Sequence, residues 1–183
     1  MEESSYTKRF TGHLKTVNHH RLLVCKYCFK LGLYYQGLTH DLSKDNPVEF
    51  LPGVKYWQGY RSPINREKEV IGYSLGWLHH KGKNKHHWEY WIDHKDKEDL
   101  KVVRMPYKYV LESFCDRLAA SRTYLKDNYK ADEPLKYFLN SKDSKILDPA
   151  NIAEFTYLLT LVKDLGEEEA LKRLKAEYKQ KKR

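Results

Sequence analysis

Glycine, proline and cysteine are scarce in this chain, with 9, 6 and 3 residues among 183. The shortage of glycine and proline leaves few breaks in regular structure, and almost no segment alternates between apolar and polar residues as a half-buried strand does. No apolar run approaches the ~18–20 residues that span a bilayer, which excludes a membrane-spanning helix. The segment Met1–Tyr6 is acidic and polar, unlike a secretion signal, so we expect a cytoplasmic protein.

The three cysteines, Cys25, Cys28 and Cys115, are odd in number and follow no secretion signal. Both facts argue against a disulfide framework. Cys25 and Cys28 have the spacing of a metal or redox pair, but no second such pair exists, and the same spacing places both on one face of a helix. We therefore expect two buried thiols in a helical core.

Apolar residues make up 40% of the chain and aromatic residues 14%, which is enough for a stable core in one domain of this length. Lysine and arginine number 34 against 25 acidic residues, a net charge of +9. The excess favours anionic partners such as nucleotides, nucleic acid or phosphoesters. Part of it lies in 179–183, where it serves solubility equally well.

Apolar residues recur with the period of a helix through nearly the whole chain, which predicts an all-α fold in a single domain over 1–183. In the first helix, Leu14, Val17 and Leu22 are among the residues expected to face the core. The predicted helices cover 13–35, 38–44, a short segment from 47, 66–80, 106–126, 149–166 and 167–183, with a loop over 51–65.

Local signals define several helix boundaries. Asn46 has the properties of a helix N-cap, Pro47 those of a first helical residue, and Glu49 those of a capping-box partner. Gly72 and Gly76 are four residues apart, and His80 follows after four more. One continuous helix would place all three on one face, allow close backbone approach and aim the imidazole inward.

Nine histidines are many for this length, and most stand in groups. Imidazole nitrogens together with an aspartate oxygen suit a first-row divalent metal. A lone histidine is usually a core residue, but four separate groups are hard to explain as independent core histidines. The groups are His19–His20, His40–Asp41, His79–His80 and His86–His87.

The stretch HDLSK at 40–44 resembles the signature of the HD-domain metal-dependent phosphohydrolases, which are helical bundles. In that family a histidine on an earlier helix precedes the His-Asp pair, a lysine follows three residues after the aspartate, and a distant aspartate completes the set. His20 and Asp116 correspond to the first and last of these. The resemblance covers roughly residues 13–126, so 127–183 is expected to be a helical extension.

The chain is more similar to a bacterial and phage branch of this superfamily that has no assigned substrate. The shared stretches are GLTHDLSK (37–44), WLHHKxxNKHHxEYW (77–91) and CDxxAAS (115–121). Three separate stretches with this order are more specific than the His-Asp pair alone.

The resemblance implies one or two divalent ions per chain, drawn from Mn, Fe, Zn, Ni, Co or Mg. One ion would take its ligands from His20, His40, Asp41 and Asp116, and a second, bridged by Asp41, would take His80, His86 and His87. The catalytic residues would be Asp41 and Lys44, and the substrate phosphate would meet Lys44, Lys83, Lys85 and Arg61.

Several assignments have alternatives. His19 can stand in for His20, and His79 for His80. In the pair 86–87, one imidazole is either a ligand or a hydrogen-bonding neighbour of a ligand.

The leading functional hypothesis is hydrolysis of a phosphomonoester or phosphodiester, in a nucleotide or related compound, by metal-activated water. Glu89 is either a general base or the partner of a histidine. A di-iron oxygenase of HD type is the second hypothesis, because the ligand set does not distinguish it. A nucleotide-binding or nucleic-acid-binding module without catalysis is the third. The C-terminal helix is compatible with a homodimer.

Overall fold

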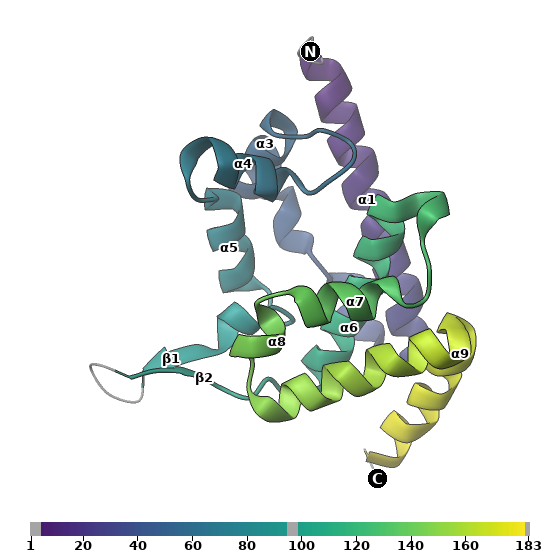
Figure 1. Cartoon of the computed structure of the whole chain (residues 1–183). Coiled ribbons are helices and arrows are strands. Elements are labelled where there is room, and N and C mark those ends of the chain that lie inside the picture. Colours follow the sequence, from purple (N-terminus) through teal and green to yellow (C-terminus); the bar gives the residue numbers. More distant parts are fainter. Residues whose placement is uncertain (1–4, 95–98, 182–183) are drawn as a thin grey trace.

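A computed structural model describes residues 5–94 and 99–181, and these segments form one helical body (Figure 1). The all-α prediction is confirmed, because the described strands are confined to one antiparallel pair in which Ile92 faces Val102. The elements are α1 (Tyr6–Leu31), α2 (Tyr34–Thr39), η1 (Leu42–Asp45), α3 (Pro47–Lys55), α4 (Pro63–Ile71), α5 (Leu75–Lys83), η2 (Trp88–Trp91), β1 (Ile92–His94), β2 (Leu100–Val102), α6 (Tyr107–Leu125), η3 (Lys126–Asn128), α7 (Glu133–Asn140), α8 (Asp143–Ile146) and α9 (Pro149–Lys181).

Cap residues set the ends of the early helices. The Asn46 side chain accepts a hydrogen bond from the Val48 backbone N–H at 3.0 Å, and Pro47 opens α3, as predicted. The first helix ends earlier than predicted, because Gly32 adopts a left-handed conformation with a φ of 79°. Glycine takes this conformation without steric cost and closes the helix there.

The predicted continuous helix over 66–80 is wrong. Gly72 has a φ of 84° and ends α4, and α5 begins after Ser74, whose hydroxyl accepts from the Trp77 N–H at 2.9 Å. Gly72 and Gly76 therefore do not share a helix face. The predicted loop over 51–65 is also too long, since α3 continues to Lys55 and α4 begins at Pro63.

The hydrophobic core lies where α1 and α6 pack together and α9 crosses them. It includes Cys28 and Cys115, both buried, whereas Cys25 is only half-buried. The core prediction fails for Leu14 and Leu22, which are 38% and 70% exposed.

The segment after 127 is part of the domain rather than an appendage. Phe138 of α7 and Phe155 and Leu158 of α9 are fully buried in the same core. The predicted break at Gly166 is confirmed, because its φ of 74° redirects α9 (Figure 1). No described helix is both long and apolar enough to cross a membrane.

The core is one-sided. In Figure 1, α3, α4 and α5 gather beside the N-terminal half of α1, and α7, α8 and α9 lie towards its other end. Among the described residues, the main hydrophobic cluster takes no side chain from α3, α4 or α5. The candidate site lies between these two parts.

Candidate metal centre

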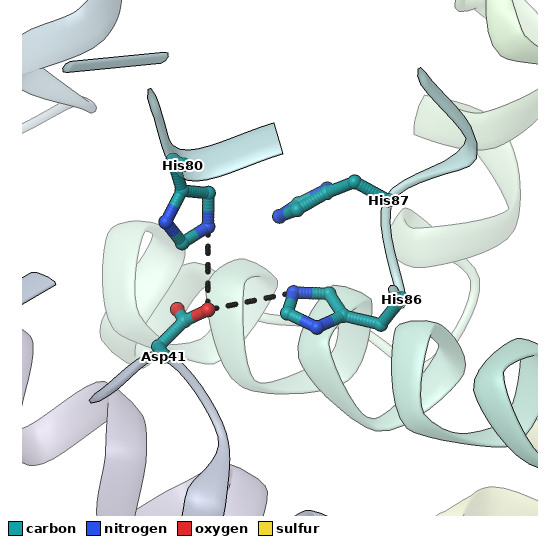
Figure 2. A group of neighbouring side chains, drawn as sticks. All are labelled: Asp41, His80, His86 and His87. Carbon is teal, nitrogen blue, oxygen red and sulfur yellow. Dashed lines mark ion pairs between the residues drawn. The ribbon is translucent and has the colours of Figure 1, made fainter. Parts of the chain in front are cut away.

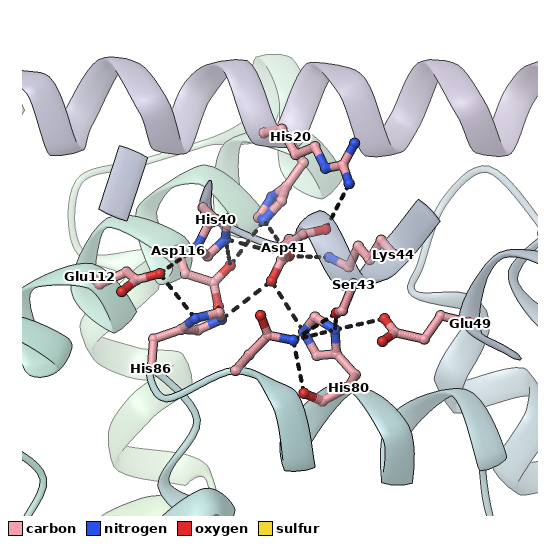
Figure 3. Close-up of polar contacts among 12 residues, drawn as sticks. His20, His40, Asp41, Ser43, Lys44, Glu49, His80, His86, Glu112 and Asp116 are labelled. Carbon is pink, nitrogen blue, oxygen red and sulfur yellow. Dashed lines mark hydrogen bonds and ion pairs between the residues drawn. The ribbon is translucent and has the colours of Figure 1, made fainter. Parts of the chain in front are cut away.

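Seven histidine and aspartate side chains converge between the two parts of the molecule. They come from α1, the turn between α2 and η1, α5, the connection between α5 and η2, and α6 (Figures 2 and 3). Three overlapping groups have ligand atoms within 4.8 Å of one another, and Asp41 belongs to two of them. The seven residues are His20, His40, Asp41, His80, His86, His87 and Asp116.

Asp41 occupies a strained turn at the middle of this cluster. Its φ is 56°, in the left-handed region that residues other than glycine seldom adopt. Arg21 holds the turn, because its Nη2 donates to the Asp41 carbonyl at 2.7 Å and also lies 2.9 Å from the carboxylate of Asp45. Strain of this kind persists where surrounding contacts enforce it, often at functional sites.

The two carboxylate oxygens of Asp41 face different sets of imidazoles. Oδ1 lies 3.2 Å from Nε2 of His80 and 3.4 Å from Nε2 of His86 (Figure 2). Nε2 or Nδ1 of His87 lies within the same 4.8 Å group. Oδ2 lies 3.4 Å from Nε2 of His40 and 3.9 Å from Nε2 of His20. Asp41 thus has the position of a carboxylate shared by two ligand groups.

Asp116 closes the cluster from α6 (Figure 3). Its Oδ1 lies 3.0 Å from Nε2 of His20 and 3.9 Å from Nε2 of His40, and its Oδ2 lies 4.0 Å from Nε2 of His86. Lys44 approaches from η1, with Nζ 2.5 Å from Oδ2 of Asp41. An ammonium group therefore stands beside the carboxylates.

The chemistry of these atoms fits divalent ions. Nε2 of His20, His40, His86 and His87 and Oδ1 of Asp41 are buried, and none forms a hydrogen bond of good geometry among the described residues, although Nε2 of His20 lies 3.0 Å from Asp116 and Oδ1 of Asp41 lies 3.2 Å from His80. Burying one such polar atom without a partner costs about 1–3 kcal/mol, so five at one place call for a shared partner. Imidazole nitrogens with a bridging carboxylate are ligands suited to a first-row divalent metal.

Two buried glutamates hold the imidazoles by their other nitrogen. Oε1 of Glu112 lies 3.1 Å from Nδ1 of His40 and 3.2 Å from Nδ1 of His86. Oε2 of Glu49 lies 2.8 Å from Nδ1 of His80. A carboxylate that accepts from Nδ1 fixes the tautomer and turns the Nε2 lone pair inward, as at known metal sites.

Sequence reasoning missed both glutamates. Glu112 precedes Asp116 by four residues, so their common helix face was a signal that could have found it. Glu49 was interpreted as a capping-box residue, but its carboxylate contacts His79 and His80 instead. Arg21 carries no sequence signal of its role, because it acts through the backbone of a turn.

Residues 9–160 of the chain match the sequence model of DUF5662, a family of unknown function. The chain belongs to the DUF5662 family. The matched span contains all seven clustered residues and both supporting glutamates, and it ends within α9. Neither the search of curated proteins nor the search of solved structures found a match.

In this DUF5662 protein the centre keeps its acids ionised. Burial raises the pKa of Asp41, but the charges of His40 and Lys44 outweigh it and hold that pKa well below its usual range. Burial lowers the pKa of His40, yet Asp41 and the hydrogen bond to Glu112 raise it to about 10. Burial, with help from nearby His86, lowers the pKa of His87, so that imidazole is neutral, the form that binds metals.

The structure also decides between the neighbouring histidines. His20 points into the cluster, whereas His19 is exposed. His80 belongs to a ligand group, whereas His79 contacts Glu49 from outside, with Nδ1 2.6 Å from Oε1. Both residues of the pair 86–87 lie within the group around Asp41.

The predicted phosphate-binding residues of the DUF5662 chain differ in their surroundings. Lys83 is exposed in the last turn of α5, and the Lys85 ammonium lies 5.7 Å from the ring centre of Tyr90. Arg61 is engaged elsewhere, because its two Nη atoms lie 2.5 and 2.7 Å from the carboxylate of Glu69. Only Lys44 among the four contacts the metal centre directly.

Proposed function

We propose that this protein is a metal-dependent phosphohydrolase of HD type, which cleaves a nucleotide or a related phosphoester by attack of water. The observation that carries the proposal is the buried carboxylate of Asp41, whose two oxygens face two sets of imidazoles with unpartnered Nε2 atoms. This is a donor set for one or two ions. It lies in a chain with a net charge of +9, which favours anionic substrates.

The two ligand groups would hold different ions. His20, His40 and Asp116 would hold one ion, with Oδ2 of Asp41. The second ion would be held by the remaining three imidazoles, with Oδ1 of Asp41. When bound, a divalent ion lowers the pKa of water towards neutrality and offsets negative charge on a phosphoryl group.

The residues around the ligands prepare the site. Glu112 and Glu49 fix three imidazoles before any ion binds, so little reorganisation is needed. Burial lowers the pKa of the Lys44 ammonium, but Asp41 and Asp116 outweigh this and raise it. A lysine that keeps its proton suits binding of a phosphate oxygen better than proton transfer, and we assign that role to it.

Metal content and hydrolysis measured on matched variants test the proposal. Asp41→Asn preserves the shape of the side chain and tolerates a φ of 56°, so the turn should stay folded while the bridging charge is lost. His20→Ala removes a ligand, and His19→Ala changes the adjacent exposed residue as its control. Elemental analysis should find one or two first-row ions in the native chain and the His19 variant, and fewer in the other two.

Hydrolysis of p-nitrophenyl phosphate and bis-p-nitrophenyl phosphate, with Mn²⁺ added, should follow the metal content. Full hydrolysis by Asp41→Asn would refute the mechanism. Two bound irons with oxygen uptake and no hydrolysis would replace it with the oxygenase hypothesis. Salt-sensitive binding of nucleotides without metal or turnover would favour the non-catalytic module.

We also propose a cytoplasmic location and a reducing environment. All three cysteines are free thiols in the described structure, and a chain with no disulfide is typical of the cytosol.

A further inference from the structure

A cleft of about 670 Å³ lies beside the metal centre, between the N-terminal half of α1, the segment after α3 and the C-terminal end of α6. No aspartate or glutamate lines it. The chemistry of its wall is basic and aromatic, carried by Lys15, His19, Trp57, Arg122, Tyr124 and Lys126.

Two of its cations are available to a ligand. Lys15 and Lys126 are exposed, and neither forms an ion pair with a carboxylate in 5–94 or 99–181. Arg122 is partly engaged, because its Nε lies 2.9 Å from Oε1 of Glu167. An anion entering the cleft would meet two ammonium groups without an ion-pair partner, together with an arginine already paired with Glu167, and no acidic side chain in the lining itself, which favours negative charge.

Lys126 is held in a costly conformation. Its φ of 51° and ψ of −120° form a backbone state that favours glycine. Apart from Asp41 at the metal centre, no other described residue except glycine has a positive φ. A lysine at a position that glycine would occupy without strain points to a use for its ammonium group, since strain of this kind is costly and clusters at functional sites.

Specific packing contacts hold the wall of the cleft in place. The indole of Trp57 donates from Nε1 to Oγ1 of Thr16 at 3.3 Å. It also rests on Gly12, where a Cβ atom would lie only 2.4 Å from the ring. A side chain at that position would displace the indole, so the glycine is required for the shape of the wall.

The cleft begins close to the metal ligands. Thr16 precedes His20 by one turn of α1, and Tyr124 follows Asp116 by about two turns of α6. These spacings of four and eight residues correspond to about 6 and 12 Å along a helix axis. A group in the cleft is therefore within reach of the same small molecule that has its reacting phosphate at the centre.

We propose that this cleft binds a second phosphate group of the substrate, at Lys15, Arg122 and Lys126. The inference rests on the proposed function and names its substrate class, a phosphoester with two separated phosphates. Either a nucleoside bisphosphate or the end of a phosphorylated nucleic-acid strand has this chemistry, and the test separates them.

Calorimetric titration of the full chain with three probes tests the inference. The probes are adenosine 5′-monophosphate, adenosine 3′,5′-bisphosphate and a 5′-phosphorylated thymidine dinucleotide. At least one probe with two phosphates should bind about tenfold or more tightly than the monophosphate, since each charge-assisted contact contributes substantially. Tighter binding of the bisphosphate identifies a small nucleotide, and tighter binding of the dinucleotide identifies a strand end.

Lys126→Gly is the decisive variant, because glycine adopts the same backbone without strain and the fold is kept. It should abolish the preference for two phosphates while metal content stays unchanged. Lys179→Ala, an exposed lysine on α9, is the control with equal charge loss and should keep the preference. In proton–nitrogen NMR spectra, the Trp57 indole signal should shift with the preferred probe.

Equal affinity for all three probes, or an unchanged preference in Lys126→Gly, would overturn the inference. The two proposals fail in different ways. Binding that shifts the Trp57 signal without any hydrolysis would keep the cleft and remove the phosphohydrolase. Hydrolysis that shows no preference for a second phosphate would do the opposite.

Discussion

The carboxylate of Glu112 is expected to control both metal ions, because one oxygen contacts an imidazole in each ligand group. Oε1 lies 3.1 Å from Nδ1 of His40 and 3.2 Å from Nδ1 of His86. Glu112→Gln keeps the size of the side chain, removes the charge and can present an amide N–H to the imidazoles. The amide oxygen that remains is a weaker acceptor than a carboxylate, and an amide N–H turned towards the rings would oppose the tautomer that presents Nε2 to an ion.

The expected loss of metal affinity follows from the usual effect of removing such a contact. Substitution of a residue that orients a metal-binding histidine weakens binding by roughly 10- to 100-fold. That factor corresponds to about 1.4–2.7 kcal/mol for each affected ion. Glu49→Gln is the internal comparison, because Glu49 contacts His80 but neither of the two histidines held by Glu112. Glu49→Gln should weaken the binding of one ion and leave the affinity for the other unchanged.

Competition titration of Mn²⁺ or Zn²⁺ against a chelator measures both affinities. Two weakened sites in Glu112→Gln and one in Glu49→Gln are expected, with circular dichroism unchanged in both. Native affinity at both sites in Glu112→Gln would refute the reasoning, since the contact would then be structural only. Loss of the same single site in both variants would show that the two ligand groups do not bind separate ions.

Three further predictions concern parts of the molecule around the centre. Gly53→Ala should lower the free energy of unfolding by about 1–3 kcal/mol in urea denaturation, because a Cβ there would lie 2.2 Å from Nε2 of His13; an unchanged midpoint would contradict this packing. Burial, together with the charge of Lys44, lowers the pKa of His13 from 6.5 to about 4. As the pH falls, His13 is therefore protonated in the unfolded chain before it is protonated in the folded one. The free energy of unfolding should fall by roughly 3 kcal/mol as the pH drops from 6.5 to 4. His13→Gln should show a shallower fall over that range, and an identical pH profile would disprove the assignment. Arg21→Ala should weaken metal binding by roughly tenfold in the same competition titration, since it removes Nη2, the one atom that contacts both the Asp45 carboxylate and the Asp41 carbonyl; unchanged affinity would show that the strained turn needs no support from α1.

Sequence periodicity was sufficient for the fold class and for helix starts with strong signals, such as Asn46 and Pro47. It was insufficient where a glycine has two possible roles. Gly32 and Gly72 both fit inside a helical pattern, and only their left-handed conformation shows that they end helices. Which apolar residues face the core is a tertiary fact too, and the exposed Leu22 illustrates it.

The seven clustered residues came from motif spacing and the resemblance, and the structure brings all of them together. The motif does not include the residues that orient the metal-binding histidines. In the sequence, Glu49 fits a helix-capping pattern, but in the structure its carboxylate contacts His79 and His80 of α5. Long-range contacts of this kind compete with local patterns, and a single sequence gives no measure of which will win.

The one-sided core has a consequence for the lifetime of the protein in a cell. Helices α3, α4 and α5, all of which the structure describes, contribute no side chain to the main hydrophobic cluster, and the ligand His80 lies on α5. Ions shared with Asp41 and Asp116 would therefore act as a clasp across the domain. Under metal starvation, these helices should exchange amide hydrogens and admit proteases first, so that metal supply would set the abundance of the protein as well as its chemistry.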